Sequence, residues 1–458
     1  MGGTQPNAEL RRLLEEIGWS PRELARQVNR VVSADRRVHR TTPFTWLEGV
    51  VPRDPLPAVV AGVLTEARGE IVTVEHLWPR RAMPTQMWLP AVAQIGDDRW
   101  MPADTVALLD KSEAAAATYF AVSGTALTPF ARSWAFTDHP LIPDTATSQR
   151  VSLTGQFIDY LDRDLAQLRR LDDGRGGELV MRAIALRLTQ VIELLRDTTY
   201  TSGVGRRLMS LAGQMAQLAG WINFDLSHHG TAQRMYLLGL RAATAAGDRQ
   251  LGALILSCIA FQQTWRERPY DAVSIMETAQ QGLRSAATPR VRALIAMREA
   301  RAFATSGMVS ETSAALDRAH EAIALGPHDN DPSWVYWMDP TVLTSEAGRC
   351  YLHLGDTPRA ERHLADGLAR LGDDTTRDRV LYGLSLALTH TRAANGQQDL
   401  ALACYEAEQV LPLLPHVGSA RCRHLIDTIL TELRPHRTTA AVREFFDKSE
   451  SLLPPAIC

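Results

Sequence analysis

Apolar residues recur at helical spacing along most of this chain, with polar residues filling the positions between them. The first such stripe has leucine or isoleucine at i, i+3, i+4 and i+7: Leu10, Leu13, Leu14 and Ile17. Arginine and glutamate occupy the opposite face, so the pattern predicts an amphipathic helix over 7–17. Gly18 follows as its C-terminal stop, because glycine readily adopts the left-handed conformation found there.

Helix-start signals divide the residues that follow into further short segments. Ser20 and Pro21 can cap and open a second helix, and Thr42 and Pro43 can do the same for a third. Two more apolar stripes, the last ending near Trp78, predict a fourth and a fifth helix. The N-terminal region is therefore predicted to hold five short helices.

Prolines recur through the next seventy residues and break up long helices, although one helix could still run from Asp104 to Ala121. These seventy residues retain several tryptophans, including Trp88 and Trp134, whereas disordered segments are poor in aromatic residues. We therefore expect a folded connector between two helical regions.

From residue 151 onward one helical pattern follows another, and beyond 205 an internal repeat emerges. A small residue is followed twelve positions later by a second one, in five pairs: Gly220 and Ala232, Ala260 and Ala272, Ala300 and Thr312, Gly348 and Ala360, and Thr389 and Ala401. A larger residue comes four positions after each second member, from Tyr236 in the first repeat to Tyr405 in the fifth. Glycine recurs at one turn offset in three repeats, at 307, 355 and 396. Since close helix crossings need small residues, the pattern predicts five stacked helix pairs around a curved groove.

Charge changes the picture only locally. The 458 residues carry a formal net charge of −3, so contact with nucleic acid requires a basic patch. Residues 20–53 provide one, because seven arginines against three acidic residues leave a charge of +4 (7 − 3). The sign of the charge reverses over 54–80.

Several function classes lack their sequence signals. No apolar run is long enough for a membrane helix, and the N-terminus has no signal-peptide pattern, so we expect a cytoplasmic protein. The five cysteines have no C-x-x-C spacing, which predicts no metal site. There is no nucleophile elbow, zinc-protease motif, phosphate loop or dinucleotide fingerprint. We therefore expect neither catalytic residues nor a cofactor, and not an enzyme.

Two motifs near the N-terminus resemble the Xre/Cro-type helix-turn-helix. Gly18-Trp19-Ser20-Pro21-x-x-Leu24-Ala25 resembles its second helix, and Thr42-Pro43-Phe44-x-Trp46-Leu47-x-Gly49 resembles its recognition helix. The connection over 29–40 is longer than the usual tight turn, as in a related variant of filamentous actinobacteria. The repeats resemble tetratricopeptide helix hairpins, best in Gly348-x-x-Tyr351 with Ala360-x-x-x-Leu364-x-x-Gly367.

Together these features resemble actinobacterial regulators that join a helix-turn-helix to tetratricopeptide-like repeats. The resemblance implies an all-α fold with a DNA-binding domain over 1–80, a connector over 81–150 and a helical-repeat sensor and dimerisation domain over 151–458. It implies a homodimer that binds double-stranded operator DNA and holds a peptide or small-molecule effector in the repeat groove, with no membrane partner.

The resemblance also implies that Trp46 and Leu47 are core and that their neighbours face DNA. We expect groove or base contacts from five residues: Arg40, Thr41, Thr42, Phe44 and Thr45. We expect phosphate contacts from five arginines: Arg22, Arg26, Arg36, Arg37 and Arg53. Phe44 has two interpretations, contact with a thymine methyl group or packing in the core.

The residue after each first small residue would face the concave groove of such an array: Trp221, Phe261, Arg301, Arg349 and His390. Trp337, with Trp334 and Tyr336, lies in the long insertion before the fourth repeat and could line the same groove. Two aromatic residues followed by three groups that can be cationic suit an anionic or peptidic ligand. The alternative is that these side chains serve packing or lie on the surface.

A second function fits the same sequence, namely a tetratricopeptide-type scaffold for protein partners without specific DNA binding. The long connection over 29–40 and the near-neutral net charge keep this alternative open. The positive segment over 20–53 distinguishes the two functions, because a scaffold does not need it.

Overall fold

The computed structural model describes residues 6–31, 37–53, 56–68, 72–79, 88–92, 95, 102–114, 118–122, 124–136, 142, 153–174, 177–283, 287–372, 375–393 and 398–453. Apart from two strands of three residues each, the regular structure in these segments is helical. Within them no helix is long and apolar enough to cross a membrane.

The N-terminal part contains the five predicted helices: α1 (Ala8–Ile17), α2 (Pro21–Val31), α3 (Thr42–Leu47), α4 (Leu56–Arg68) and α5 (Val74–Leu77). Their apolar stripes meet in one core, in which Leu10, Leu24, Trp46 and Leu64 are fully or almost fully buried. Burial of these stripes holds the short helices together, since isolated helices of this length are marginal in water.

Local capping signals act nearly as predicted. Gly18 ends α1 with a φ of 75°, and the Ser20 hydroxyl accepts a hydrogen bond of 3.1 Å from a backbone N–H in the first turn of α2. The start of α3 differs from the prediction by one residue, because Thr41 rather than Thr42 is its N-cap. The Thr41 hydroxyl is 2.8 Å from Nδ1 of His39 and makes no capping bond to the helix.

The connector contains β1 (Trp88–Pro90), α6 (Pro102–Ala114), β2 (Thr118–Phe120), the 3₁₀ turn η2 (Gly124–Ala126) and α7 (Thr128–Phe136). The two strands pair in parallel, with Trp88 opposite Thr118. Neither strand was predicted, because three residues are too few to show an alternating pattern. The helix expected over 104–121 is shorter than predicted, since α6 ends at Ala114 and residues 118–120 form β2.

The connector packs into the core of the repeat region. Trp134 is almost fully buried there, against helices α12 (Arg249–Trp265) and α13 (Pro269–Leu283). A Cβ atom at Gly252 would come within 1.9 Å of the Trp134 ring, and one at Gly282 within 2.1 Å. These two glycines therefore make room for an anchor that fixes the connector to the array.

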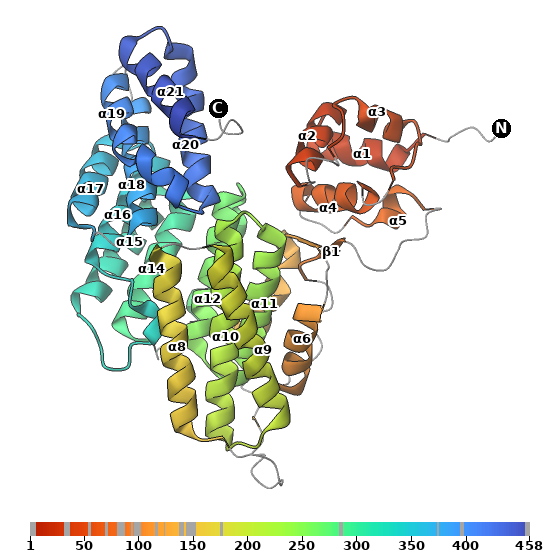
Figure 1. Cartoon of the computed structure of the whole chain (residues 1–458), viewed down its shortest axis with the longest axis vertical. Coiled ribbons are helices and arrows are strands. Elements are labelled where there is room, and N and C mark those ends of the chain that lie inside the picture. Colours follow the sequence, from red (N-terminus) through yellow and green to blue (C-terminus); the bar gives the residue numbers. More distant parts are fainter. Residues whose placement is uncertain are drawn as a thin grey trace, which may run out of the picture.

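The remaining helices form a sequential array (Figure 1). It consists of α8 (Gly155–Gly174), α9 (Glu178–Asp197), α10 (Ser202–Asp225), α11 (His229–Ala246), α12 (Arg249–Trp265), α13 (Pro269–Leu283), α14 (Pro289–Thr305), α15 (Val309–Ala324), η4 (Ser333–Val335), α16 (Pro340–His353), α17 (Thr357–Arg370), α18 (Thr376–Thr391), α19 (Leu400–Val410), η5 (Leu411–His416), α20 (Ala420–Leu433), η6 (Arg434–His436) and α21 (Ala440–Leu452). Neighbouring helices pack in pairs from α10 with α11 to α18 with α19, as the repeat predicts.

Gly220 and Gly348, two small residues of the repeat, lie at close helix crossings, as predicted. A Cβ atom at Gly220 would be 2.5 Å from the Tyr236 ring, and one at Gly348 would be 2.8 Å from Leu364. Two of the three predicted turn glycines, at 307 and 355, have positive φ, and the third, at 396, lies outside the described residues.

The predicted register of the fifth repeat is wrong. Ala401 is exposed and 56% of Tyr405 is accessible to solvent, whereas Ala403 and Ala407 are fully buried. The buried face of α19 therefore begins fourteen residues after Thr389 instead of twelve, so the connection between these two helices is longer than the repeat assumes.

Candidate nucleic-acid interface and ligand cavity

Helix α3 has one face in the core and one face open to solvent. Trp46 and Leu47 are buried, as the family resemblance implied, while 42% of Phe44 is accessible and Thr45 is exposed. This exposure contradicts one of the two interpretations of Phe44, namely packing in the core. Thr41 is exposed and Thr42 is half-buried at the start of the helix.

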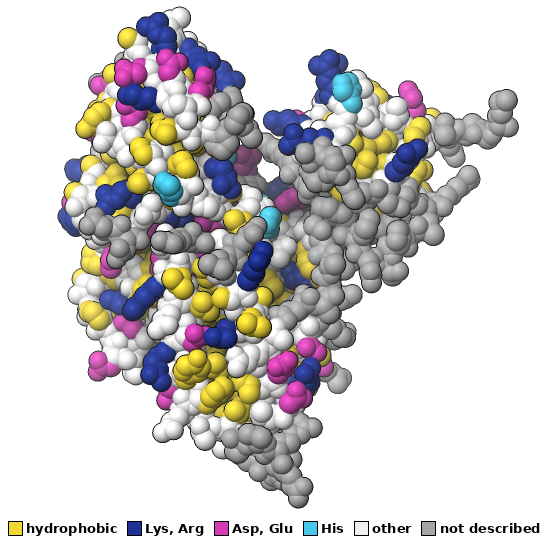
Figure 2. All heavy atoms as spheres, in the orientation of Figure 1, with side chains coloured by type: hydrophobic (Ala, Val, Ile, Leu, Met, Phe, Trp, Pro, Cys, Tyr) yellow, Lys and Arg dark blue, Asp and Glu magenta, His cyan; other side chains and the backbone are white. Residues whose placement is uncertain are grey.

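Exposed arginines come both before and after α3 in the chain. Arg22 and Arg26 project from α2, Arg37 and Arg40 precede α3, and Arg53 follows it, all with exposed side chains. Figure 2 shows basic side chains gathered at the end of the N-terminal domain where α2 and α3 lie. Arg36, the remaining candidate, falls outside the described residues.

Most of these arginines are available for an external anion. Arg26 pairs with Glu23 at 2.7 Å, but the other four form no ion pair with any residue that the structure describes. These four are Arg22, Arg37, Arg40 and Arg53. An exposed cation without a partner can bind a phosphate without first breaking an existing contact.

The side chain of Asn29 links the two ends of the long connection between α2 and α3. The Asn29 amide donates to the carbonyl of Val38 at 2.9 Å, and its oxygen accepts from the Val38 N–H at 2.7 Å. This pair of bonds fixes the start of the segment that carries Arg40 into α3, although the connection is longer than a tight turn.

A second candidate site is a cavity of about 120 Å³ inside the helical array. A single water needs only about 10–15 Å³ of such space, so the cavity has room for a small organic ligand. Four of the predicted groove residues line it: Trp221, Phe261, Trp337 and Arg349. Trp334 and Tyr336, from the insertion before the fourth repeat, line it as well.

The other two predicted groove residues do not line the cavity. Arg301 is almost completely buried beside it, with its guanidinium 3.7 Å from the Glu346 carboxylate. His390 is buried near the far end of α18, whereas the part of α18 that lines the cavity is its first two turns, from Arg377 to Tyr382. Eight residues of helix separate Tyr382 from His390, a rise of about 12 Å.

The residues one turn before the predicted groove positions line the cavity too: Leu218, Cys258, Arg298 and Glu346. Each lies three residues before a predicted position, on the same helix face. Extending the predicted groove by one turn towards the N-terminus of each first helix would therefore have found them. Arg298 is the important addition, since it is a buried cation.

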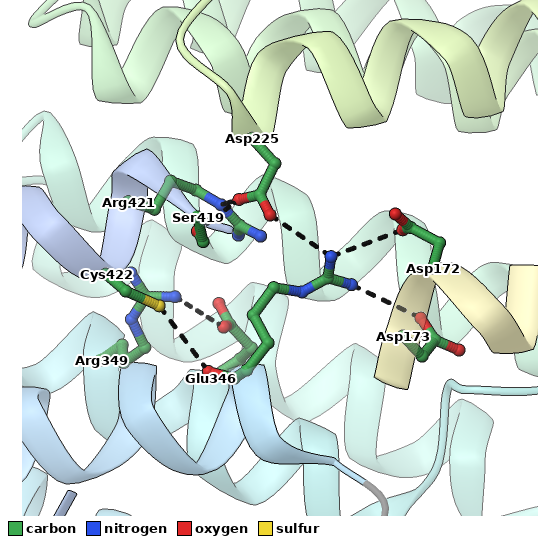
Figure 3. A network of polar contacts seen from close by, with 9 residues as sticks. Asp172, Asp173, Asp225, Glu346, Arg349, Ser419, Arg421 and Cys422 are labelled. Carbon is green, nitrogen blue, oxygen red and sulfur yellow. Dashed lines mark hydrogen bonds and ion pairs between the residues drawn. The ribbon is translucent and has the colours of Figure 1, made fainter. Parts of the chain in front are cut away.

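An ion-pair network closes one side of the cavity (Figure 3). Arg377 of α18 lies 3.4 Å from Asp172 and 3.5 Å from Asp173, both at the end of α8, and 3.3 Å from Asp225 at the end of α10. Asp225 also accepts hydrogen bonds of 2.6 Å from Arg421 and from the Ser419 hydroxyl. The network thus joins the start of the array to helices near its end.

Burial and charge shift the pKa values of these acids in opposite directions. Burial raises the pKa of Asp172, and it raises the pKa of Asp173 to about 6. Burial would also raise the pKa of Glu346, but Arg349, at 2.9 Å, with Arg301 and Arg298 lowers it to about 2. Glu346 therefore stays ionised and neutralises part of the positive charge around the cavity.

Among the described residues, no group of three histidine, cysteine or acidic side chains is arranged to hold a metal ion. The cavity combines aromatic walls, apolar side chains and guanidinium groups, an arrangement that suits binding of a small anion with an apolar body.

The N-terminal helices are similar to a described protein family. Residues 10–77 match the family described as the SP15 N-terminal domain, and the matched stretch covers α1 to α5 almost completely. No curated protein matches the chain.

Proposed function

We propose that this chain is a DNA-binding transcriptional regulator whose N-terminal helices bind operator DNA and whose helical array holds a controlling effector. The observation that carries the proposal is the two-sided character of α3. Trp46 and Leu47 fix its inner face in the core, while Phe44 and Thr45 are exposed. Of the exposed arginines before and after α3, Arg22, Arg37, Arg40 and Arg53 form no ion pair with any described residue.

In this proposal α3 enters the major groove and its exposed side chains contact base edges, with Phe44 against a thymine methyl group. The exposed arginines bind phosphates on either side and fix the position of the helix. The resemblance of residues 18–49 to a helix-turn-helix supports this arrangement. Two copies of the chain would read the two halves of a palindromic operator.

A contact between the array and the N-terminal helices supports control by an effector. Arg266, directly after α12, forms an ion pair of 3.0 Å with Glu66 of α4 and donates a 3.0 Å hydrogen bond to the carbonyl of Val122. Arg268, in the same turn, donates to the carbonyl of Ala67. Helix α12 also lines the cavity through Phe261, so a ligand there can bias how the N-terminal helices are held.

The experiment measures how the full-length protein binds a fluorescent mixed-sequence duplex over a range of salt concentrations. Each phosphate contact contributes about 0.9 to the slope of log affinity against log salt. Arg22 and Arg37 contact phosphates in this proposal, whereas Arg40 contacts the groove. Changing the three together to Ala should therefore lower the slope by about 2, whereas Arg11→Ala should leave it unchanged. Arg11 is a matched control because it is exposed on α1, also without a side-chain partner in the described structure.

Equal affinity and equal slope for the wild type and the triple variant would contradict the proposal. That result would favour the alternative function, a scaffold that binds protein partners.

A further inference from the structure

We propose that the cavity binds a small organic monocarboxylate, with its carboxylate on the guanidinium of Arg298 and its apolar body against the aromatic walls. This assignment deepens the proposed function by naming the chemical class of the effector. The binding site itself does not depend on DNA binding, so the two proposals can fail separately.

Arg298 is a buried cation that forms no ion pair with an acidic group of the described structure, although the Glu346 carboxylate attracts it from further away. Only 9% of the residue is accessible, and it lines the cavity. No group that the structure describes forms a hydrogen bond or a close ion pair with it. Loss of solvation on burial lowers the pKa of Arg298, which means that its charge is incompletely compensated. A buried charge in this condition gains strongly from an anion placed beside it.

Aromatic rings hold the Arg298 guanidinium in place. Its central carbon lies 4.1 Å from the ring centre of Phe261, 5.6 Å from that of Trp221 and 5.7 Å from that of Trp337. Rings at these distances stabilise a cation through its faces and leave the N–H edges for hydrogen bonds. A carboxylate matches such an edge with two parallel hydrogen bonds.

The other arginines that line the cavity already have partners. Arg349 pairs with Glu346, Arg421 pairs with Asp225, and Arg377 pairs with Asp172, Asp173 and Asp225. Arg169 donates a 2.9 Å hydrogen bond to Gln214 through one terminal nitrogen, while its other terminal nitrogen has no hydrogen-bond partner in the described structure. Arg298 is therefore the arginine of the lining that lacks a polar partner among the described residues.

The charge count of the cavity favours a single negative charge on the ligand. Five arginines line it, against four acidic residues: Asp172, Asp173, Glu346 and Asp378. The difference is +1 (5 − 4), so one carboxylate neutralises the lining. A phosphate monoester would place a second negative charge among four carboxylates, which disfavours it.

The remaining lining describes the rest of the ligand. It contains aliphatic side chains, such as Leu254, Met297 and Leu381, and several aromatic rings. The Tyr382 hydroxyl has no hydrogen-bond partner in the described structure and can donate a second bond to the ligand. A compact acid with an aromatic or short aliphatic body fits these walls and this volume.

The test titrates the full-length protein, without DNA, with benzoate, indole-3-acetate and hexanoate by isothermal calorimetry. Benzamide, a neutral analogue of benzoate, and phenyl phosphate, a dianion, are the matched ligands. At least one carboxylate should bind at millimolar concentration or below, about tenfold or more tightly than benzamide or phenyl phosphate.

Arg298→Gln should weaken binding of that carboxylate about tenfold or more, and Tyr382→Phe should weaken it by less. Arg292→Gln, on the exposed side of the same helix α14, should leave it unchanged. Equal binding of benzoate and benzamide, equal binding by Arg298→Gln, or no binding of any of the three acids would overturn the assignment. The comparison between ligands on the wild type holds even if the Arg298 variant does not fold.

Discussion

Removal of Arg377 is expected to destabilise the helical array in a pH-dependent way. Only 12% of its side chain is accessible, and it faces Asp172, Asp173 and Asp225 at 3.3–3.5 Å. Breaking a buried ion pair costs about 3–5 kcal/mol, because it leaves a buried charge uncompensated. Asp225 keeps Arg421 and Ser419 as partners, so most of the loss comes from Asp172, and we expect about 3 kcal/mol for Arg377→Ala at pH 7.5.

The pH dependence follows from Asp172. Burial already raises its pKa with Arg377 present, and without Arg377 it rises further above the value of about 3.9 in the unfolded chain. Ionisation of such a carboxyl opposes folding above pH 4, and the penalty grows as the pH rises. The loss of stability should therefore be smaller at pH 5 than at pH 7.5.

Urea denaturation followed by circular dichroism at both pH values measures this loss. Arg370→Ala, which removes a surface pair with Asp366, is the control and should cost less than about 1 kcal/mol. Asp172→Asn added to Arg377→Ala should restore part of the stability. A loss below about 1 kcal/mol for Arg377→Ala at pH 7.5, or an equal loss at pH 5, would refute the reasoning.

Three further changes test other parts of the structure. Gly348→Ala puts a Cβ atom 2.8 Å from Leu364 and should lower the free energy of unfolding, measured by urea denaturation, by about 1–3 kcal/mol. An unchanged or raised free energy of unfolding would be inconsistent with a close helix crossing at Gly348. Because burial raises the pKa of Asp173 to about 6, ionisation of this carboxyl opposes folding as the pH rises from about 4 to 6. Asp173→Asn should therefore reduce any fall in melting temperature over that range. A pH profile identical to that of the wild type would show that this carboxyl is not responsible. Arg266→Ala removes the ion pair with Glu66 and should speed hydrogen exchange in α4 but not in α16; unchanged exchange in α4 would mean that this contact does not hold the N-terminal helices.

The N-terminal helices were predictable because their signals are local. Gly18 and Ser20 act within one turn of the residues they cap, and the stripe that begins at Leu10 needs only a helix to bury it. The start of α3 was predicted one residue late because both Thr41 and Thr42 are residues that can serve as the N-cap of a helix with Pro43 in its first turn. The exposure of Phe44 depends on how α3 packs, so the sequence left it open.

The repeat predicted the helix pairs and part of the cavity for a different reason. Trp221 and Phe261 recur at the same position in stacked units, so periodicity places them on one face. The network around Arg377 could not be predicted in this way, because it joins residues up to 205 positions apart. It depends on how α8 and α10 lie relative to α18 in the folded array, which the repeat spacing does not encode.

The most direct test of the proposed function is selection of DNA by the purified full-length protein. Random duplexes are incubated with the wild type, with Arg11→Ala, and with the variant in which Arg22, Arg37 and Arg40 are Ala, at near-physiological salt. Our account predicts that the wild type and Arg11→Ala enrich one two-fold symmetric sequence and that the triple variant does not. No enriched sequence, or the same sequence enriched equally by the triple variant, would contradict it.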